Sequence, residues 1–369
     1  MDLLIEDGVI QKIGPNLLCE GQIIDACGRY VLPGFVDVHI HGGGGADFMD
    51  GTAQAFETVA KTHLAKGTTT LVATAMTAAR EELLAFTEGY HRFKAASPYA
   101  SVIAGMHLEG PYLSGAGKGA QNEKRIRKVD LQEVAELLER GQGNILRWDA
   151  APEIPESEAF AKIMKENGVL CGVAHTDATA EETQAGFAAG FSHVTHFYNA
   201  VTAYKKRGQV VTAGVVEAAY LNEDVTVELI CDGHHIPKAC LQLALKVKGP
   251  DRVLGITDAT RLSGTDLKTG KLGSRETGMD VVADDGVAKL PDLSSFAGSI
   301  CTMEQALQVL CKDYGVDVVT AAKLLSTNPA RHIGLEAQIG AIAEGLAADL
   351  VIADGDYSVC SVIKAGALV

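Results

Sequence analysis

The stretch GFVDVHIH, from Gly34 to His41, decides the fold that we predict. It is a short apolar run rich in β-branched residues, which is typical of a buried strand, and it ends in a pair of histidines. Runs of the same kind recur along the chain, and we interpret eight of them as strands. They are GFVDVHIH from Gly34, TTTLVATA from Thr68, SVIAGMHLE from Ser101, LRWDAAPE from Leu146, VLCGVAHT from Val169, HVTHFYNA from His193, TVELICDG from Thr226 and VLGITDA from Val253.

Amphipathic helical patterns separate these runs, as in REELLAFTEGYHRFKAA and VDLQEVAELLERG. Strand–helix alternation at this spacing predicts a parallel sheet, and eight units indicate that the sheet closes. The predicted fold class is therefore α/β, with a (β/α)8 TIM-like barrel. An open doubly wound sheet is the alternative, but it usually carries GxGxxG after its first strand, and HGGGGAD from His41 does not match that motif.

The two ends of the chain differ from its middle. Strand-and-turn sequences such as IEDGVIQKIG and IGAIAEGLAADLVIADGDYSV occupy them. We expect residues 1–34 and 336–369 to meet as a small β-sandwich beside a barrel of residues 35–335. A barrel takes roughly 250 residues, so a chain of 369 residues accommodates both parts.

Composition excludes several classes of protein. The formal net charge of −15 and the pI of about 5.2 argue against a nucleic-acid partner, because an acidic surface repels polyanions. The eight cysteines include no CxxC pair and favour reduced core residues over a disulfide framework. The N-terminal MDLLIEDGVIQKIG is acidic where a signal peptide is basic, and no apolar run reaches membrane-spanning length. We therefore expect a cytoplasmic protein with no membrane partner.

Side chains that bind metals gather at the carboxyl ends of the predicted strands. Active sites of barrels lie at this rim, where residues far apart in sequence become neighbours. Residues two apart in a strand point to the same side, which places His39 with His41 on the inner face and His107 below Glu109. The candidates are His39, His41, Glu109, His175, His196, Asp232, His235 and Asp258.

These residue types point to hydrolytic metal chemistry. Imidazole and carboxylate ligands suit zinc, iron or manganese, and a catalytic metal lowers the pKa of water towards 7. Such a reaction also needs a separate carboxylate for proton transfer. Asp258, at the strand end in GITDA, is the natural candidate.

Each candidate taken alone has an ordinary structural explanation. An HxH pair such as His39 and His41 arises by chance, and His193 can be a hydrogen-bonded packing residue. Asp258 can be a helix N-cap, and Glu109 can begin a turn. The joint placement favours a site, because eight of the eleven histidines lie within or just beyond the predicted strands.

Together, the segments at these strand ends resemble the amidohydrolase superfamily, and within it the N-acetylglucosamine-6-phosphate deacetylase family. The resemblance runs from Leu32 to Leu307 and so covers the barrel. HxH is moderately specific to the superfamily, whereas HLEGP together with THFYNA and DGxH is much more specific to the deacetylases. The matching segments are LPGFVDVHIHG, MHLEGPYLSGAGKGAQN, VAHTDATAEE, VTHFYNAV, ICDGHHI, GITDA and FAGSICTMEQAL.

The resemblance implies a role for each matching position. The primary metal ligands of the family correspond to Glu109, His175 and His196. Ligands of a second ion correspond to His39 and His41, so one or two divalent transition-metal ions are expected, with zinc favoured and iron or manganese as alternatives. The family's contacts to the sugar phosphate correspond to Gln121, Asn199, Ala200, Arg207 and His235.

The proton-transfer role stays with Asp258, which resembles the catalytic acid/base of the family. His235 resembles a second catalytic group that polarises the amide carbonyl, and its neighbour His234 is a rival for that role. The residues support Arg207 independently, because an acidic protein that binds a phosphate must supply local positive charge. The alternative for the cluster Lys205 to Arg207 is an exposed basic loop.

The expected reaction is metal-dependent deacetylation of N-acetylglucosamine 6-phosphate in amino sugar metabolism, by a homodimer as in related enzymes. The alternatives are N-acetylgalactosamine 6-phosphate as substrate, another amidohydrolase activity, or a catalytically silent barrel that serves as a binding module. Three features depart from the family pattern. Gln121 stands where many members have histidine, the segment TRLSGTDLKTGKLG differs from the usual small-residue loop, and the first strand of the sandwich is expected to be missing.

Overall fold

The computed structural model describes residues 1–369 apart from the side chain of Arg207. Its centre is one sheet of eight parallel strands, with neighbours in the order β15-β14-β11-β10-β9-β8-β7-β4. Each predicted strand is present, most of them within a few residues of the expected ends, although the sixth ends at Val194 rather than at Ala200. The predicted (β/α)8 fold class is confirmed. The strands are β4 (Phe35–Ile40), β7 (Thr68–Ala75), β8 (Ile103–Glu109), β9 (Ile145–Ala150), β10 (Leu170–Val173), β11 (Phe191–Val194), β14 (Thr226–Ile230) and β15 (Val253–Ile256).

The sheet closes where β15 meets β4. Just beyond β15, the amide of Asp258 donates to the carbonyl oxygen of His39 at 3.0 Å. The hydroxyl of Thr257 donates to the carboxylate of Asp37 at 2.5 Å. Burial raises the pKa of Asp37 to about 7. The segment after the last strand is therefore hydrogen-bonded to the first strand next to His39 and Asp258.

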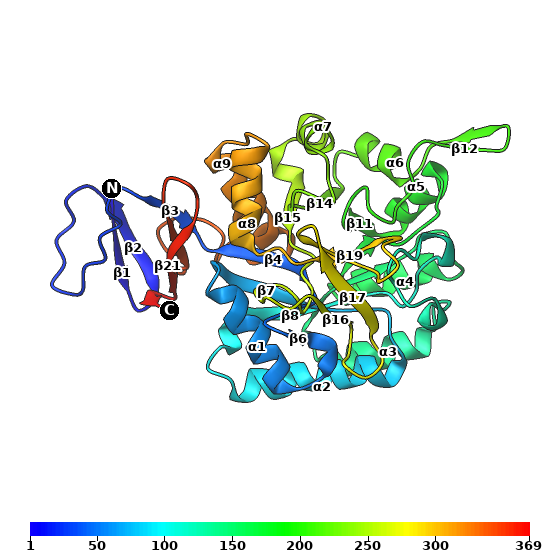
Figure 1. The fold of residues 1–369 in the computed structure, drawn as a ribbon, viewed down its shortest axis with the longest axis horizontal. Helices are drawn as coiled ribbons and strands as arrows, with labels where there is room; N and C mark the ends of the chain where they lie inside the picture. The colour runs from blue at the N-terminus through cyan, green and yellow to red at the C-terminus, as the bar shows by residue number, and fades with distance from the viewer.

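Helices cover the outside of the barrel (Figure 1). Several start at residues whose side chains accept a backbone amide hydrogen bond, among them Thr52, Asp130, Thr179 and Thr302. The helices are α1 (Ala53–Leu64), α2 (Arg80–Ala96), α3 (Leu131–Gly141), α4 (Ser157–Glu166), α5 (Ala180–Ala189), α6 (Val215–Leu221), α7 (Lys238–Lys248), α8 (Met303–Gln308), α9 (Val318–Ala322) and α10 (Asn328–His332). None of the helices in the described part of the chain is long and apolar enough to cross a membrane.

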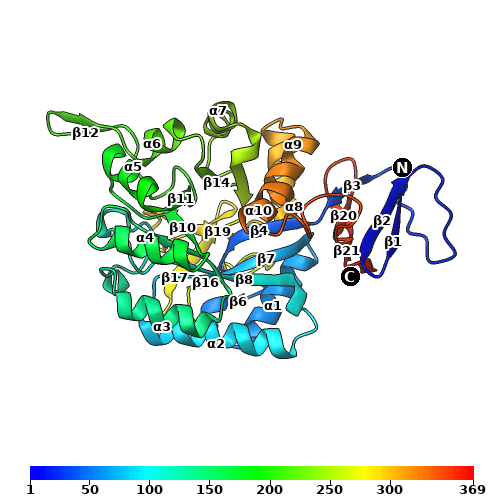
Figure 2. The same cartoon turned by 180° about the vertical axis from the view of Figure 1, so that it is seen from behind.

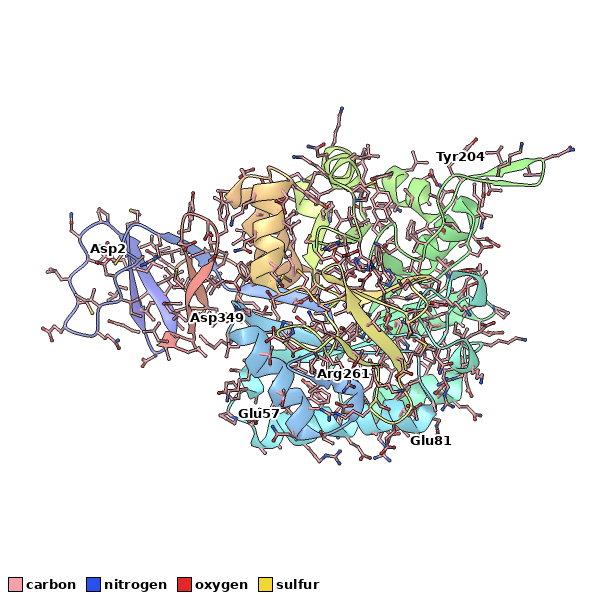
Figure 3. All side chains as sticks on the ribbon, in the orientation of Figure 1. Asp2, Glu57, Glu81, Tyr204, Arg261 and Asp349 are labelled. Carbon is pink, nitrogen blue, oxygen red and sulfur yellow. The ribbon has the colours of Figure 1, made fainter. Side chains whose placement is uncertain are left out.

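Two insertions were not predicted as strands. After β11 comes a hairpin of β12 (Lys205–Arg207) and β13 (Val210–Thr212), which projects from the body of the molecule (Figures 1 and 2). Figure 3 labels Tyr204, where this hairpin begins. After β15 comes an antiparallel sheet over the barrel mouth, made of β16 (Thr269–Leu272), β17 (Met279–Asp284), β18 (Val287–Lys289) and β19 (Phe296–Ser299).

A small β domain lies beside the barrel and holds both chain ends (Figure 2). Its core is apolar, with Ile10, Leu350, Ile352 and Ile363 buried together. This packing of the two-stranded sheet on the four-stranded one agrees with the expected sandwich, whereas the boundaries at residues 34 and 336 stay a prediction. The strands are β1 (Asp2–Glu6), β2 (Val9–Gly14), β3 (Tyr30–Pro33), β20 (Leu350–Ala353), β21 (Val359–Lys364) and β22 (Ala367–Leu368).

Candidate metal centre and active site

One carboxylate and two imidazoles converge at the carboxyl ends of β8, β10 and β11. The Oε1 atom of Glu109 lies 2.9 Å from Nε2 of His175 and 2.9 Å from Nε2 of His196, and the two nitrogen atoms are 3.1 Å apart. All three residues are buried. Ligand atoms about 3 Å apart fit around a transition-metal ion bonded at roughly 2.0–2.2 Å.

His39, His41 and Asp258 form a second group of possible ligand atoms, next to the first. Nε2 of His41 lies 3.1 Å and Nε2 of His39 3.6 Å from Oδ1 of Asp258. His39 is completely buried, and its Nε2 has no hydrogen-bond partner among the described residues. A buried imidazole nitrogen without a partner is unfavourable, so these residues also fit a metal ion.

Glu109 lies between the two groups. Its Oε1 faces His175 and His196, while its Oε2 lies 3.4 Å from Nε2 of His41. Burial opposes ionisation of this carboxyl, but hydrogen bonds from His175 and His196 outweigh burial and hold its pKa well below the ordinary value. The geometry allows one carboxylate to serve two adjacent ions.

Left-handed backbone aims several of these side chains. His175, His196 and Asp258 have φ values of 45°, 29° and 51°. The sequence suggested that His196 lies on its strand, but β11 ends at Val194 and His196 lies in the turn beyond it. Non-glycine residues in this region cost energy and are concentrated at functional sites, which agrees with the turns serving to present the side chains.

A buried charged layer supports His39 from below. Oε2 of Glu228 accepts a hydrogen bond from Nδ1 of His39 at 3.1 Å, and Oε1 accepts one from Nη1 of Arg147. Nε2 of His193 lies 3.1 Å from Oε1 of the same carboxylate. Burial opposes ionisation of Glu228, yet Arg147 and His193 keep its pKa well below the ordinary value. Glu228 therefore fixes which nitrogen of His39 faces the site.

Glu228 was missed from sequence, although a signal existed. It is a carboxylate inside the otherwise apolar run TVELIC, and period-two alternation places it on the same side of β14 as Ile230. His107 lies in the same buried layer, 2.8 Å from Asp149, and its ring packs edge-on against that of His39, but it belongs to neither group of ligand atoms.

The predicted substrate contacts, apart from Arg207, line one cavity above these groups. Asn199, Ala200, Gln121 and His235 all border it. His235 is held by a 2.7 Å hydrogen bond from its Nδ1 to Oδ2 of Asp232, which leaves Nε2 for a ligand. His234 is exposed and does not border the cavity, so the geometry favours His235 over its rival.

Gln121 contacts a candidate metal ligand, whereas Arg207 lies on the projecting hairpin. The Gln121 amide donates to Oε2 of Glu109 at 2.8 Å, and its oxygen accepts from the amide of Thr77 at 3.1 Å, so it orients a candidate ligand as well as lining the cavity. The side chain of Arg207 lies outside the described part of the structure, and its predicted phosphate contact stays a prediction. Its backbone belongs to the projecting hairpin.

Phe296 and Gly298 of β19 also border the cavity and were not predicted as site residues. The Phe296 ring lies against the His235 ring, with centroids 4.7 Å apart. The segment FAGSICTMEQAL resembles the family, but it carries no local pattern that predicts an inserted sheet over the barrel mouth.

Comparison with known proteins defines the class of enzyme. Residues 30–369 match the Amidohydrolase family, and the chain belongs to that family as a hydrolase of amide bonds. The N-acetylglucosamine-6-phosphate deacetylase of Lysinibacillus sphaericus is 32% identical, with 99% of this chain and 92% of the relative covered. The N-acetylgalactosamine-6-phosphate deacetylase of Escherichia coli O157:H7 is 28% identical over 97% of this chain and 91% of that protein.

A solved structure agrees with this result. The N-acetyl-D-glucosamine-6-phosphate deacetylase of Mycobacterium smegmatis, a variant in complex with N-acetyl-D-glucosamine 6-phosphate, superposes with a TM-score of 0.90. It is 33% identical, with 99% of this chain and 93% of that chain covered. The resemblance inferred from sequence motifs is confirmed over nearly the whole chain.

Proposed function

We propose that the protein hydrolyses N-acetylglucosamine 6-phosphate to glucosamine 6-phosphate and acetate, a step of amino sugar metabolism. The observation that carries this proposal is the convergence of Glu109, His175 and His196 opposite Asp258, at the mouth of a barrel similar to deacetylases over its full length. A catalytically silent barrel is disfavoured, because all five candidate ligands and the candidate acid/base are present and buried.

Metal dependence follows from the ligand groups. We assign the first ion to Glu109, His175 and His196, and a second to His39 and His41 with Glu109 between them. A bound divalent ion supplies Lewis acidity, which lowers the pKa of water and polarises a carbonyl oxygen. Zinc is favoured by the nitrogen-rich donor set, with iron or manganese as alternatives.

Asp258 is assigned to proton transfer. Burial opposes its ionisation, but the hydrogen bond from His41 and the charges of His39 and His41 outweigh burial and lower its pKa. The carboxylate is therefore ionised at neutral pH and accepts the proton of the attacking water. The same proton then passes to the nitrogen of the amide as the C–N bond breaks, so that acetate and the free amine are released.

His235 is assigned to the substrate. The carboxylate of Asp232 fixes Nδ1 as a donor. A doubly protonated ring then donates from Nε2 to the acetyl carbonyl oxygen, whereas a neutral ring accepts a hydrogen bond from a sugar hydroxyl. Either contact orients the acetyl group over the ligand groups.

Phosphate binding and assembly are proposed together. Asn199 and Ala200 border the cavity, and the hairpin of Lys205 to Thr212 carries Arg207 outward from the barrel (Figure 1). Val210 and Val211 on this hairpin are 62% and 51% exposed. We propose a homodimer in which the hairpin of one subunit reaches the cavity of the other and Arg207 grips the phosphate. A phosphorylated sugar does not cross a bilayer unaided, so we place the enzyme in the cytoplasm.

The test is an assay of free-amine release from N-acetylglucosamine 6-phosphate, N-acetylgalactosamine 6-phosphate and both unphosphorylated sugars. We expect the glucosamine 6-phosphate derivative to have the highest kcat/KM. Preference for the galactosamine epimer would redirect the assignment to the function named for the Escherichia coli relative. No amine release from any of the four sugars by metal-loaded protein would overturn the proposal.

A further inference from the structure

The cavity bordered by Gln121, Asn199 and His235 is named here the reaction cavity. One side of it is apolar and includes no residue that was predicted for the site. Met76 follows β7, the second strand of the barrel, and Leu272 ends β16 above it. Both side chains border the cavity and are almost completely buried. In a barrel of eight strands the second lies opposite the sixth, which here is β11, and β11 leads to Asn199 and Ala200. Met76 therefore faces the assigned sugar-phosphate side across the ligand groups.

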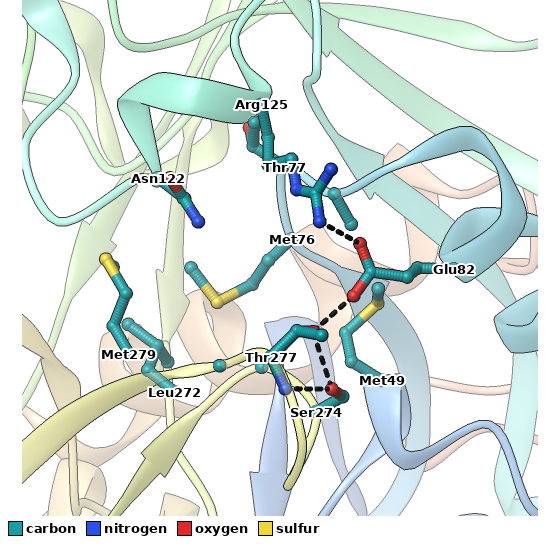
Figure 4. Close-up of a pocket in the computed structure, with 13 residues that line it drawn as sticks. Met49, Met76, Thr77, Glu82, Asn122, Arg125, Leu272, Ser274, Thr277 and Met279 are labelled. Atoms are coloured by element: carbon teal, nitrogen blue, oxygen red, sulfur yellow. Dashed lines mark hydrogen bonds and ion pairs between the residues drawn. The ribbon is translucent and has the colours of Figure 1, made fainter.

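A second, smaller cavity lies behind Met76 and Leu272. These two residues border both cavities, so their side chains form the wall between the two. Met49 and Met279 complete the apolar wall of the second cavity (Figure 4). About 30 Å³ of it is open to the centre of a water molecule, which is enough for one or two additional carbon atoms.

Polar side chains that contact one another form a rim around the second cavity. Oε2 of Glu82 lies 3.8 Å from Nη2 of Arg125, and Oε1 of Glu82 accepts a hydrogen bond from the hydroxyl of Thr277. Figure 4 shows this chain of contacts continuing to Ser274, in the turn between β16 and β17 of the inserted sheet. Because the rim ties α2 to the inserted sheet, the apolar space between them is part of the fold.

The chemistry of the proposed substrate indicates which of its groups would occupy this apolar space. In an N-acetylhexosamine phosphate the acetyl methyl is the one group without a polar atom. We place the sugar against Asn199 and His235 and the carbonyl over Glu109, which leaves the apolar side of the same cavity, at Met76 and Leu272, for the acyl carbon chain. Methionine is unbranched and adapts its rotamer, so Met76 can move aside for a longer chain.

We propose that the space behind Met76 and Leu272 is an acyl subsite that extends the substrate range to N-propionyl and N-butyryl glucosamine 6-phosphate. This inference rests on the proposed deacetylase function and names the acyl groups that the same site accepts. Hydrolysis balances as for the acetyl substrate: water adds to the carbonyl carbon, the C–N bond breaks, and propionate or butyrate leaves with the free amine.

The first experiment measures free-amine release by the metal-loaded wild-type enzyme from the N-acetyl, N-propionyl and N-butyryl sugars. We expect the two longer substrates to retain kcat/KM within about tenfold of the acetyl substrate, because the subsite has room for the added carbon atoms. A pocket closed behind the acetyl group would instead lower kcat/KM by roughly 10- to 200-fold for each added methylene. Hydrolysis of the acetyl substrate with no turnover of the longer ones overturns the acyl subsite and leaves the proposed function intact. Failure of all three overturns the proposed function itself.

The second experiment fills the subsite. Met279 borders the second cavity and not the reaction cavity, so Met279→Trp should lower kcat/KM for the butyryl sugar at least about tenfold and leave the acetyl sugar within about twofold. Leu243→Trp on the exposed face of α7 is the control and should change neither. Met279→Phe is the milder variant if tryptophan prevents folding. Equal effects on both substrates, or no effect on either, would place the acyl chain elsewhere and overturn the inference.

Discussion

At the scale of single residues, Glu109 is the group on which both candidate metal positions depend, because its two oxygen atoms face different histidines. We predict that Glu109→Ala loses both ions, whereas His39→Ala loses only the second. Elemental analysis of freshly purified variants measures the ratio of metal to protein. Full metal occupancy in Glu109→Ala would show that the ligand assignment is wrong.

Asp258 is predicted to transfer the proton. Asp258→Asn should bind metal and substrate but lose at least about two orders of magnitude in kcat, because an amide accepts no proton at neutral pH. Steady-state kinetics on the phosphorylated sugar, with metal content measured on the same sample, check this prediction. Near-normal turnover would remove Asp258 from the mechanism, and loss of metal would make it mainly a ligand.

Glu228 is predicted to position His39. In Glu228→Gln the charge that faces both Arg147 and His39 is lost, so occupancy of the second metal position should fall while that of the first is retained. Losing the carboxylate also leaves the buried guanidinium of Arg147 with Asp149, at 3.7 Å, as its remaining charge partner, which should destabilise the fold by up to about 3–5 kcal/mol.

A matched control separates these two effects. Glu133 is also a buried carboxylate, bonded to Arg127 at 2.5 Å and to the hydroxyl of Tyr112 at 2.9 Å, but it lies outside the ligand groups. Glu133→Gln should lower stability and leave metal content unchanged. If both variants lose metal equally, Glu228 has only a structural role.

At the scale of elements, the glycine-rich turn after β4 is anchored by a helix. Nε2 of His63 on α1 donates to the carbonyl oxygen of Gly42 at 3.0 Å, and a side chain on Gly43 would collide with the His63 ring. Burial lowers the pKa of His63 to about 4. The turn beside the site therefore depends on a neutral histidine.

This arrangement predicts a pH dependence of stability. The unfolded chain binds a proton at His63 below pH 6.5 and the folded protein does not until about pH 4, so the folded state loses stability as pH falls through that range. Between pH 7 and pH 5 the loss from this residue should be about 2 kcal/mol. His63→Gln keeps the donor to Gly42 and should remove that part of the acid destabilisation. Urea unfolding at both pH values measures it, and equal losses in the two proteins would contradict the prediction.

At the scale of the whole molecule, the proposed homodimer would connect catalysis to assembly through the projecting hairpin. Arg207→Ala should raise KM for the phosphorylated sugar, with a loss of roughly 10- to 150-fold in kcat/KM, and should barely change turnover of the unphosphorylated sugar. A parallel fall for both sugars would assign Arg207 a structural role.

Mixed dimers test whether the neighbour supplies Arg207. When Arg207→Ala and Asp258→Asn subunits are combined, each mixed dimer has one cavity with both wild-type groups. Statistical mixing should therefore restore about one quarter of wild-type activity. If mixing restores no activity although mixed dimers form, Arg207 acts within its own subunit.

The sequence by itself determined the barrel and the identity of the candidate ligands. A buried parallel strand is a short β-branched run, and its period of two fixes which face each side chain occupies, so GFVDVHIH shows His39 and His41 on one side. Because functional groups of a barrel collect at one rim, Glu109, His175 and His196 were expected to be neighbours before any distance was known.

Only the tertiary structure decided how these side chains meet. That Glu109 faces two groups, that Glu228 holds His39, and that His235 rather than His234 borders the cavity all depend on contacts between residues distant in sequence. The same is true of the inserted sheet, whose short strands form a wall of the cavity after folding over the barrel mouth. Local patterns record burial and periodicity, whereas the direction of a side chain at a turn and the partner it meets are set by long-range packing, which no local window of sequence contains.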